Sequence, residues 1–168
     1  GGAFVGTIPP EGMAALLRAR LREAGEADCV QGSPVPGGRH STEVRRLRYA
    51  IISDVHANVT ALEAVLAHIE EIEIDRTVCL GDVVGYNASP NECAELLRQK
   101  NVLTILGNHD AVACGLEEAW GFNPVAHEAA MWTREQLSSE NFEWLRTLPD
   151  MLNFGAFVAV HGAPKNHN

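Results

Sequence analysis

The chain has 168 residues, of which 46% are hydrophobic and 21% charged, and its formal net charge is -9 at pH 7. This composition is that of an ordinary globular protein with a substantial core, which excludes wholesale disorder. The acidic balance argues against stable nucleic-acid binding and against a membrane partner, since both need an excess of Lys and Arg.

Four cysteines are spread along the chain without a Cys-x-x-Cys pair: Cys29, Cys79, Cys93 and Cys114. This spacing predicts neither a disulfide framework nor a structural zinc site. We expect small apolar side chains in a reducing compartment. No apolar run approaches a membrane span and no secretion signal opens the chain, so a cytoplasmic protein is expected.

The N-terminal quarter differs from the rest. Residues 9–27 have the spacing of an amphipathic helix, and residues 31–40 (QGSPVPGGRH) have the composition of a linker. We therefore predict an N-terminal extension over 1–47 and a domain over 48–168.

From residue 48 onward, strands and helices are predicted to alternate. The expected strands are residues 49–52, 77–80, 102–106 and 154–160. Asn58 is expected to cap a helix from 59 to 72, and Ser89-Pro90-Asn91-Glu92 has the capping-box spacing for a helix to about 100. Two more helices are expected after Asn123-Pro124 and around Phe142. This alternation predicts an α/β fold, in which ligands gather beyond the carboxyl ends of the strands.

Each predicted strand ends in potential metal ligands. They are Asp54, His56, Asp82, Asn108 and His161. Each residue alone could be an ordinary turn, cap or surface residue. Turn chemistry alone does not readily explain why all four strand ends carry potential ligands. If the four strands are parallel neighbours, the ligands meet at one point. Carboxylates with imidazoles suit a divalent transition metal, and Gly81 and Gly107 would allow close backbone approach.

Other polar and aromatic residues are expected to lie apart from this cluster. His40, His68 and His167 are interpreted as solvated or structural, while His127 could approach the site from its helix. The three tryptophans are expected to anchor the core and not to stack on nucleic-acid bases, because no basic surface accompanies them. They are Trp120, Trp132 and Trp144.

The motifs Asp54-x-His56, Gly81-Asp82, Gly107-Asn108-His109-Asp110 and His161-Gly162 resemble, in order and in placement, the first four blocks of the calcineurin-like metallophosphoesterase superfamily. The resemblance runs from about residue 48 to the end and is closest to the small bacterial and archaeal phosphodiesterases. It implies a four-layer αββα sandwich.

The resemblance also implies a site. Asp54 and His56 would hold one divalent cation, Asn108 and His161 a second, and Asp82 would bridge them; the metals would be Mn, Fe or Zn. A metal-bound hydroxide would attack a phosphodiester or phosphomonoester in line. His109 would protonate the leaving oxygen, with Asp110 orienting its ring. The partner would be a small phosphate ester or a nucleotide. Formation of a homo-oligomer is left open.

Two departures from the superfamily stand out. Gly85-Tyr86-Asn87 replaces the Asp-Arg-Gly of protein phosphatases and dinucleoside-tetraphosphate hydrolases, so their phosphate-gripping arginine is absent. The superfamily's final Gly-His-x-His block is also missing before Asn168, which predicts a C-terminally truncated domain. The alternative interpretation is a non-catalytic module that keeps the fold and binds a ligand or partner.

Overall fold

The computed structural model describes residues 47–163. The predicted N-terminal helix and linker, Cys29, His40 and His167 lie outside the described residues. In chain order the elements are β1 (Tyr49–Ile52), α2 (Val59–Glu71), β2 (Arg76–Cys79), α3 (Pro90–Gln99), β3 (Leu103–Thr104), α4 (Asn108–Ala113), α5 (Pro124–Gln136), α6 (Ser139–Arg146), β4 (Met151–Asn153) and β5 (Val158–Val160). None of the helices in this part of the chain is long and apolar enough to span a membrane.

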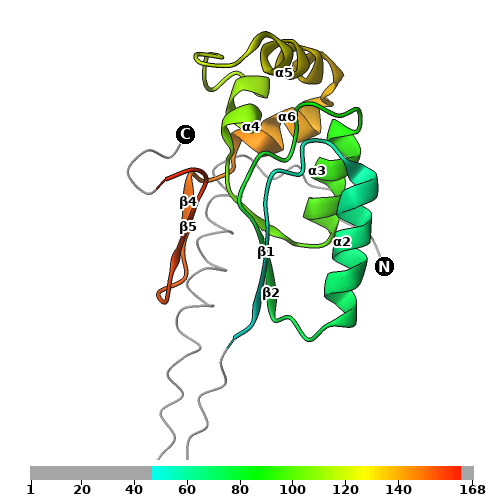
Figure 1. Cartoon of the computed structure of the whole chain (residues 1–168), viewed down its shortest axis with the longest axis vertical. Helices are drawn as coiled ribbons and strands as arrows, with labels where there is room; N and C mark the ends of the chain where they lie inside the picture. Colours follow the sequence, from blue (N-terminus) through cyan, green and yellow to red (C-terminus); the bar gives the residue numbers. More distant parts are fainter. Residues whose placement is uncertain (1–46, 164–168) are drawn as a thin grey trace, which may run out of the picture. The chain divides into compact units, whose positions relative to one another are not determined.

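The first three strands form a parallel sheet in the order β1-β2-β3. Ile52 is level with Cys79, and Cys79 is level with Thr104, so the three carboxyl ends lie at one edge of the sheet. The connections run through α2 and α3, which lie on the same side of the strands in Figure 1. The sheet therefore brings together the loops that carry the first three predicted ligand motifs.

The helices begin where the sequence predicts them. Asn58 caps α2 by accepting a hydrogen bond from the Ala61 backbone N–H at 3.1 Å. Ser89 stands at the N-cap of α3, but its side chain makes no capping hydrogen bond, so the predicted capping box is wrong. Pro90 still favours a helix start, because its φ is fixed and its missing N–H is not needed in the first turn.

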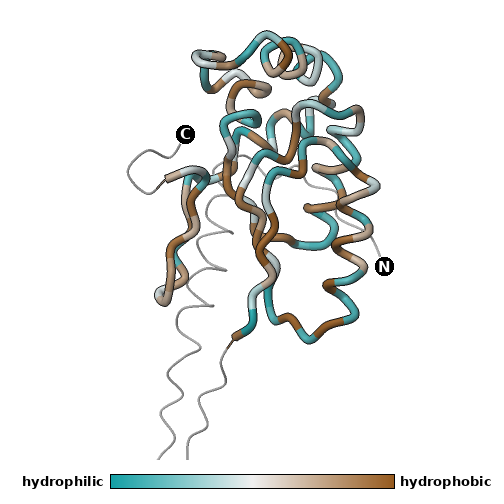
Figure 2. Tube along the Cα trace, viewed as in Figure 1, coloured by the Kyte–Doolittle hydropathy of each residue, from teal (hydrophilic) through white to brown (hydrophobic). Residues whose placement is uncertain are grey.

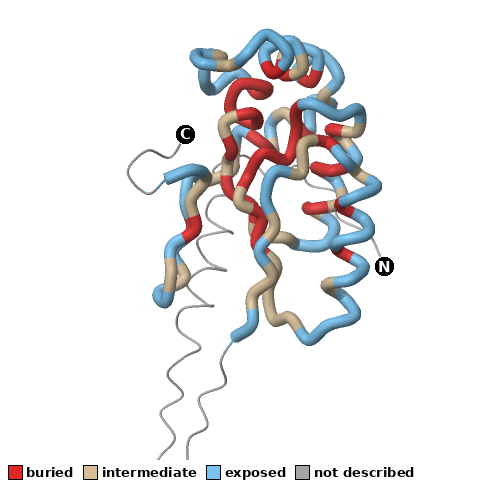
Figure 3. The backbone as a smooth tube through the Cα atoms, in the orientation of Figure 1, coloured by how far each residue is buried: buried red, intermediate tan, exposed pale blue. Residues whose placement is uncertain are grey.

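The core lies between the sheet and its covering helices. Apolar segments line the interior in Figure 2, and Figure 3 shows buried positions in the second half of β2, the loop that follows it, α3 and α4. The fully buried cluster consists of Leu62, Leu66, Cys79, Val83, Val84, Cys93, Leu97, Ala113, Cys114 and Leu145. Three of the cysteines are buried and free, as predicted for the part of the chain that the structure describes.

The fourth predicted strand is wrong in both extent and partner. Residues 154–157 turn back instead of extending: Phe154 donates its N–H to the Phe157 carbonyl, and Gly155 adopts a left-handed φ of +79°. The result is a separate antiparallel sheet of β4 and β5. Its turn packs against the first sheet through Tyr49, whose ring centroid lies 5.3 Å from Phe154 and 5.1 Å from Phe157. The fold is thus mixed α/β with two sheets.

The tryptophans do not all anchor the core. Trp144 is half-buried against the core cluster, as expected. Trp120 is 88% exposed and Trp132 is 41% exposed. Both lie on or near α5, where aromatic residues face outward.

Candidate metal centre

The segment after β1 continues alongside the segment after β2 beyond the regular sheet. Asp54 donates its backbone N–H to the Gly81 carbonyl at 3.1 Å, and His56 donates to the Asp82 carbonyl at 2.8 Å. Asp54, His56 and Asp82 all have positive φ, at 56°, 47° and 53°. Left-handed backbone at non-glycine residues costs free energy and is concentrated at functional sites. The backbone pairing therefore holds these three candidate ligands side by side.

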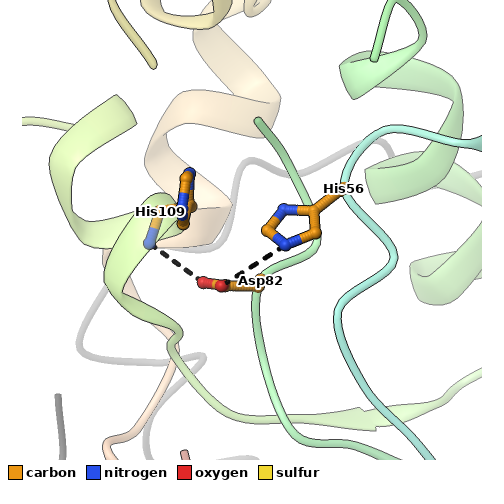
Figure 4. A group of neighbouring side chains, drawn as sticks. All are labelled: His56, Asp82 and His109. Atoms are coloured by element: carbon orange, nitrogen blue, oxygen red, sulfur yellow. Dashed lines mark hydrogen bonds and ion pairs between the residues drawn. The ribbon is translucent and has the colours of Figure 1, made fainter. Parts of the chain in front are cut away.

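Asp82 lies at the centre of the group. Its residue is only 3% exposed. One carboxylate oxygen, Oδ1, accepts the backbone N–H of His109 at 2.9 Å. The other, Oδ2, lies 3.7 Å from His56 Nε2 and 3.6 Å from His161 Nε2. Figure 4 shows Asp82 between the His56 ring and the start of α4.

Two glycines make this arrangement possible, as predicted. A Cβ on Gly81 would lie 2.5 Å from the Gly107 nitrogen, and a Cβ on Gly107 would lie 2.1 Å from the Asp82 nitrogen. No side chain fits between backbones this close.

Asn108 and His161 complete the group from different elements. Asn108 begins α4, a helix that the sequence did not predict, and His161 directly follows β5. Asn108 Oδ1 lies 2.9 Å from His161 Nε2. His161 reaches the group even though β5 is not a parallel neighbour of the first sheet, because the hairpin packs across that sheet. All five predicted ligands thus lie in one chain of contacts that runs from Asp54 through His56 and Asp82 to His161 and Asn108.

The two candidate ligand histidines are oriented alike. His161 Nδ1 lies 2.7 Å from the Leu80 carbonyl, and His56 Nδ1 lies 3.1 Å from the Val84 carbonyl. A carbonyl only accepts, so Nδ1 carries the proton in the neutral ring and Nε2 has a free lone pair. Metal-binding histidines are commonly fixed in this way. In this orientation the lone pair of His161 Nε2 faces a lone pair of Asn108 Oδ1, and a cation between the two atoms would bind both.

The spacing of the donor atoms also fits metal ions. Gaps of 3.6 and 3.7 Å are too long for hydrogen bonds. Two ligand atoms that each lie about 2.0–2.2 Å from one ion can be no more than about 4.4 Å apart. His109 offers a further potential ligand atom, but this wider group of His56, Asp82 and His109 spans up to 4.8 Å. The donor set of carboxylates, imidazoles and an amide oxygen therefore fits divalent cations.

The predicted role of Asp110 is wrong. Its carboxylate does not orient the His109 ring, because Oδ1 accepts the Val84 N–H at 3.0 Å and Oδ2 accepts the Gly107 N–H at 3.1 Å. Asp110 instead joins the loop after β2 to the start of α4. Burial, and then the charge of Asp82, raise the pKa of Asp110 to about 7, although the backbone N–H bonds oppose that rise.

His109 lies among aromatic rings rather than beside a carboxylate that orients it. Its ring centroid is 4.8 Å from that of Tyr86 and 4.5 Å from that of Phe122. Nδ1 is buried without a hydrogen-bond partner, close to Gly85. Burial lowers the pKa of His109, and the charge of Asp82 partly offsets this effect. Sequence reasoning missed both aromatic neighbours.

The remaining histidines of the described part lie elsewhere. His68 is exposed on α2 beside Glu71, as expected. His127 lines a small cavity of about 130 Å³ with Met131 and Arg134 of α5, and none of the five candidate ligands lines that cavity.

The comparisons with known proteins point to one superfamily. The model of the calcineurin-like phosphoesterase superfamily domain matches residues 47–167. An uncharacterised protein of Methanocaldococcus jannaschii is 46% identical over 100 residues, which are 60% of this chain and 41% of that protein. The chain therefore spans less than half the length of this relative.

Solved structures resemble the chain as well. A metallophosphoesterase from Sphaerobacter thermophilus is 41% identical with a TM-score of 0.60, covering 73% of this chain and 49% of that one. A hypothetical protein from Pyrococcus horikoshii is 26% identical with a TM-score of 0.64, covering 73% of this chain and 57% of that one. The predicted metallophosphoesterase fold class is thereby confirmed.

Proposed function

Since the chain belongs to the calcineurin-like phosphoesterase superfamily, we propose that it hydrolyses a phosphate ester at a centre of two divalent cations. The observation that carries the proposal is the pair of histidines, His56 and His161. Both direct Nε2 at the buried Asp82 Oδ2, and each is fixed at Nδ1 by a backbone carbonyl. Imidazole nitrogens on both sides of a buried carboxylate are a donor set that suits a metal ion.

The ligands divide between two ions. Asp54 and His56 would hold one cation, Asn108 and His161 the other, and Asp82 would touch both. Two such cations supply a water nucleophile of lowered pKa and neutralise charge on the phosphate during an in-line displacement. Manganese, iron and zinc all suit this mixture of oxygen and nitrogen donors.

His109 would act on the leaving group. Water adds to phosphorus, the P–O bond to the alcohol breaks, and the leaving oxygen takes up a proton. Because Nδ1 is buried against Gly85, Nε2 is the ring atom able to meet that oxygen. Nε2 would give its proton to that oxygen, and the proton released by the attacking water would restore the ring through solvent.

The test uses the full protein with bis(4-nitrophenyl) phosphate and 4-nitrophenyl phosphate, with Mn²⁺ and after chelation. We expect hydrolysis that depends on metal. Asp82→Asn should lower kcat/KM more than about 100-fold and weaken Mn²⁺ binding in calorimetry. The exposed Asp150→Asn is the matched control and should change neither. Full activity of Asp82→Asn would refute the two-metal assignment, and an inactive wild-type protein that still binds metal would favour the binding module.

A further inference from the structure

We propose that Tyr86 and Phe122 form a binding surface for an aromatic group on the leaving alcohol, so that the substrate is a phosphodiester with an aryl or nucleoside leaving group. This inference rests on the proposed function and names its substrate class. The observation behind it is a set of rings on the proton donor: Tyr86 and Phe122 are each tilted against His109, at 40° and 33°.

The location of these rings ties them to the leaving group. Whatever His109 protonates must come within hydrogen-bond distance of its ring, so the rest of that alcohol meets the neighbours of His109. Tyr86 also contacts His56 edge-on, with 4.8 Å between ring centroids. It thus touches both a ligand histidine and the proton donor.

The rings are partly free to bind. Tyr86 is 45% exposed, and Phe122 is half-buried. An exposed tyrosine on left-handed backbone, with a φ of 61° directly after Gly85 at 92°, is a strained placement for a bulky residue. Flat aromatic surfaces beside a reacting group favour stacking with another aromatic ring.

The charges near the site favour a diester over a monoester. Among the described residues, no hydrogen bond or ion pair joins a Lys or Arg to the five candidate ligands, His109 or Tyr86. A monoester carries a second negative charge, which arginine forks commonly neutralise. The singly charged phosphate of a diester needs no such partner beyond the cations.

The experiment measures kcat/KM for matched substrate pairs on the full protein at saturating Mn²⁺. Methyl phenyl phosphate is paired with methyl hexafluoroisopropyl phosphate, whose leaving alcohol has similar acidity but no ring. The methyl ester of adenosine 5′-phosphate is paired with the methyl ester of ribose 5-phosphate. The aromatic preference is the ratio within each pair, which cancels any loss of folded or metal-loaded protein.

We expect Tyr86→Leu and Phe122→Leu to lower the aromatic preference about 3- to 10-fold, the size of one aromatic contact. Tyr86→Phe should keep the aromatic preference. Trp120→Leu should keep it as well, because Trp120 lies in the same loop as Phe122 and is exposed, but its ring does not contact His109. A fall in the phenyl pair or in the adenosine pair supports the proposal and identifies the aromatic group.

A second measurement is independent of turnover. Saturation-transfer NMR with phenol on the metal-free protein should show binding by the wild type and by Tyr86→Phe, and loss of binding in Tyr86→Leu. Unchanged ratios in both pairs, from an active wild-type enzyme, would overturn the inference and leave the proposed function intact. A wild-type enzyme without metal-dependent hydrolysis would instead refute the proposed function.

Discussion

Replacing Gly107 by alanine would place a methyl group against the backbone of Asp82. Gly107 has φ -99° and ψ 166°, an extended conformation that alanine adopts without strain. Backbone strain therefore adds nothing to the effect of Gly107→Ala, and any loss comes from the contacts of the added Cβ. That atom would lie 2.1 Å from the Asp82 nitrogen and 2.2 Å from Asp82 Oδ1.

The size of the effect follows from these distances. Ordinary contacts of a Cβ begin at 3.4 Å, so the two backbones must separate by more than 1 Å. Overpacking of this kind costs about 1–3 kcal/mol of stability. A shift of about 1 Å in Asp82, the ligand proposed to be shared by two ions, is expected to lower kcat/KM about 100-fold and metal affinity at least 10-fold.

The assay combines calorimetric titration with Mn²⁺, hydrolysis of bis(4-nitrophenyl) phosphate and urea denaturation. Gly155→Ala in the β4–β5 turn is the control: its φ of +79° makes alanine strained, but a Cβ there meets nothing within 4 Å. We expect the control to lose about 1 kcal/mol of stability and to keep its metal affinity. Wild-type metal affinity in Gly107→Ala would show that this backbone contact does not position Asp82.

Three further outcomes are expected. His109→Ala should keep Mn²⁺ affinity in calorimetry but slow hydrolysis, more for esters of weakly acidic alcohols than for nitrophenyl esters; an equal loss for both would contradict its role at the leaving oxygen. In metal-free protein, Asp110 has a pKa of about 7 in the folded state and of 3.8 in the unfolded state. Between these two pH values the folded state holds a proton that the unfolded state has lost, so the free energy of unfolding should fall as the pH rises to about 7. Urea midpoints at pH 5 and 7.5 should differ less in Asp110→Asn, and an unchanged difference would exclude this carboxyl as the source. In a Cys29→Ser background, the buried thiols, whose pKa burial raises to 11 or 12, should react with a thiol reagent at pH 8 only after unfolding; fast reaction of the folded protein would contradict their burial.

Much of the site could be predicted from the sequence because the first sheet is parallel. Short apolar segments before Asp54, Asp82 and Asn108 end at one edge of the sheet, and the order of the strands does not alter that. The glycine positions were predictable for a related reason, since each stands where two strand exits must meet.

The remaining features depend on tertiary contacts that no local pattern encodes. Residues 154–160 are apolar enough for one strand, and only the packing of Phe154 and Phe157 on Tyr49 explains the turn between them. Asp110 follows His109 in sequence, but α4 turns its carboxylate toward Val84 and Gly107. The packing of Phe122 against His109 depends on the path of a loop whose sequence has no periodicity.

The candidate ligands are divided between two sheets. Four follow strands of the first sheet, whereas His161 is supplied by the hairpin of β4 and β5. Ions held by all five would act as a reversible cross-link, so that opening of the hairpin and release of metal become one linked equilibrium. Such linkage is reciprocal. The rings of Tyr49, Phe154 and Phe157 supply no ligand, yet because they hold the hairpin against the first sheet they would set part of the metal affinity of the proposed centre.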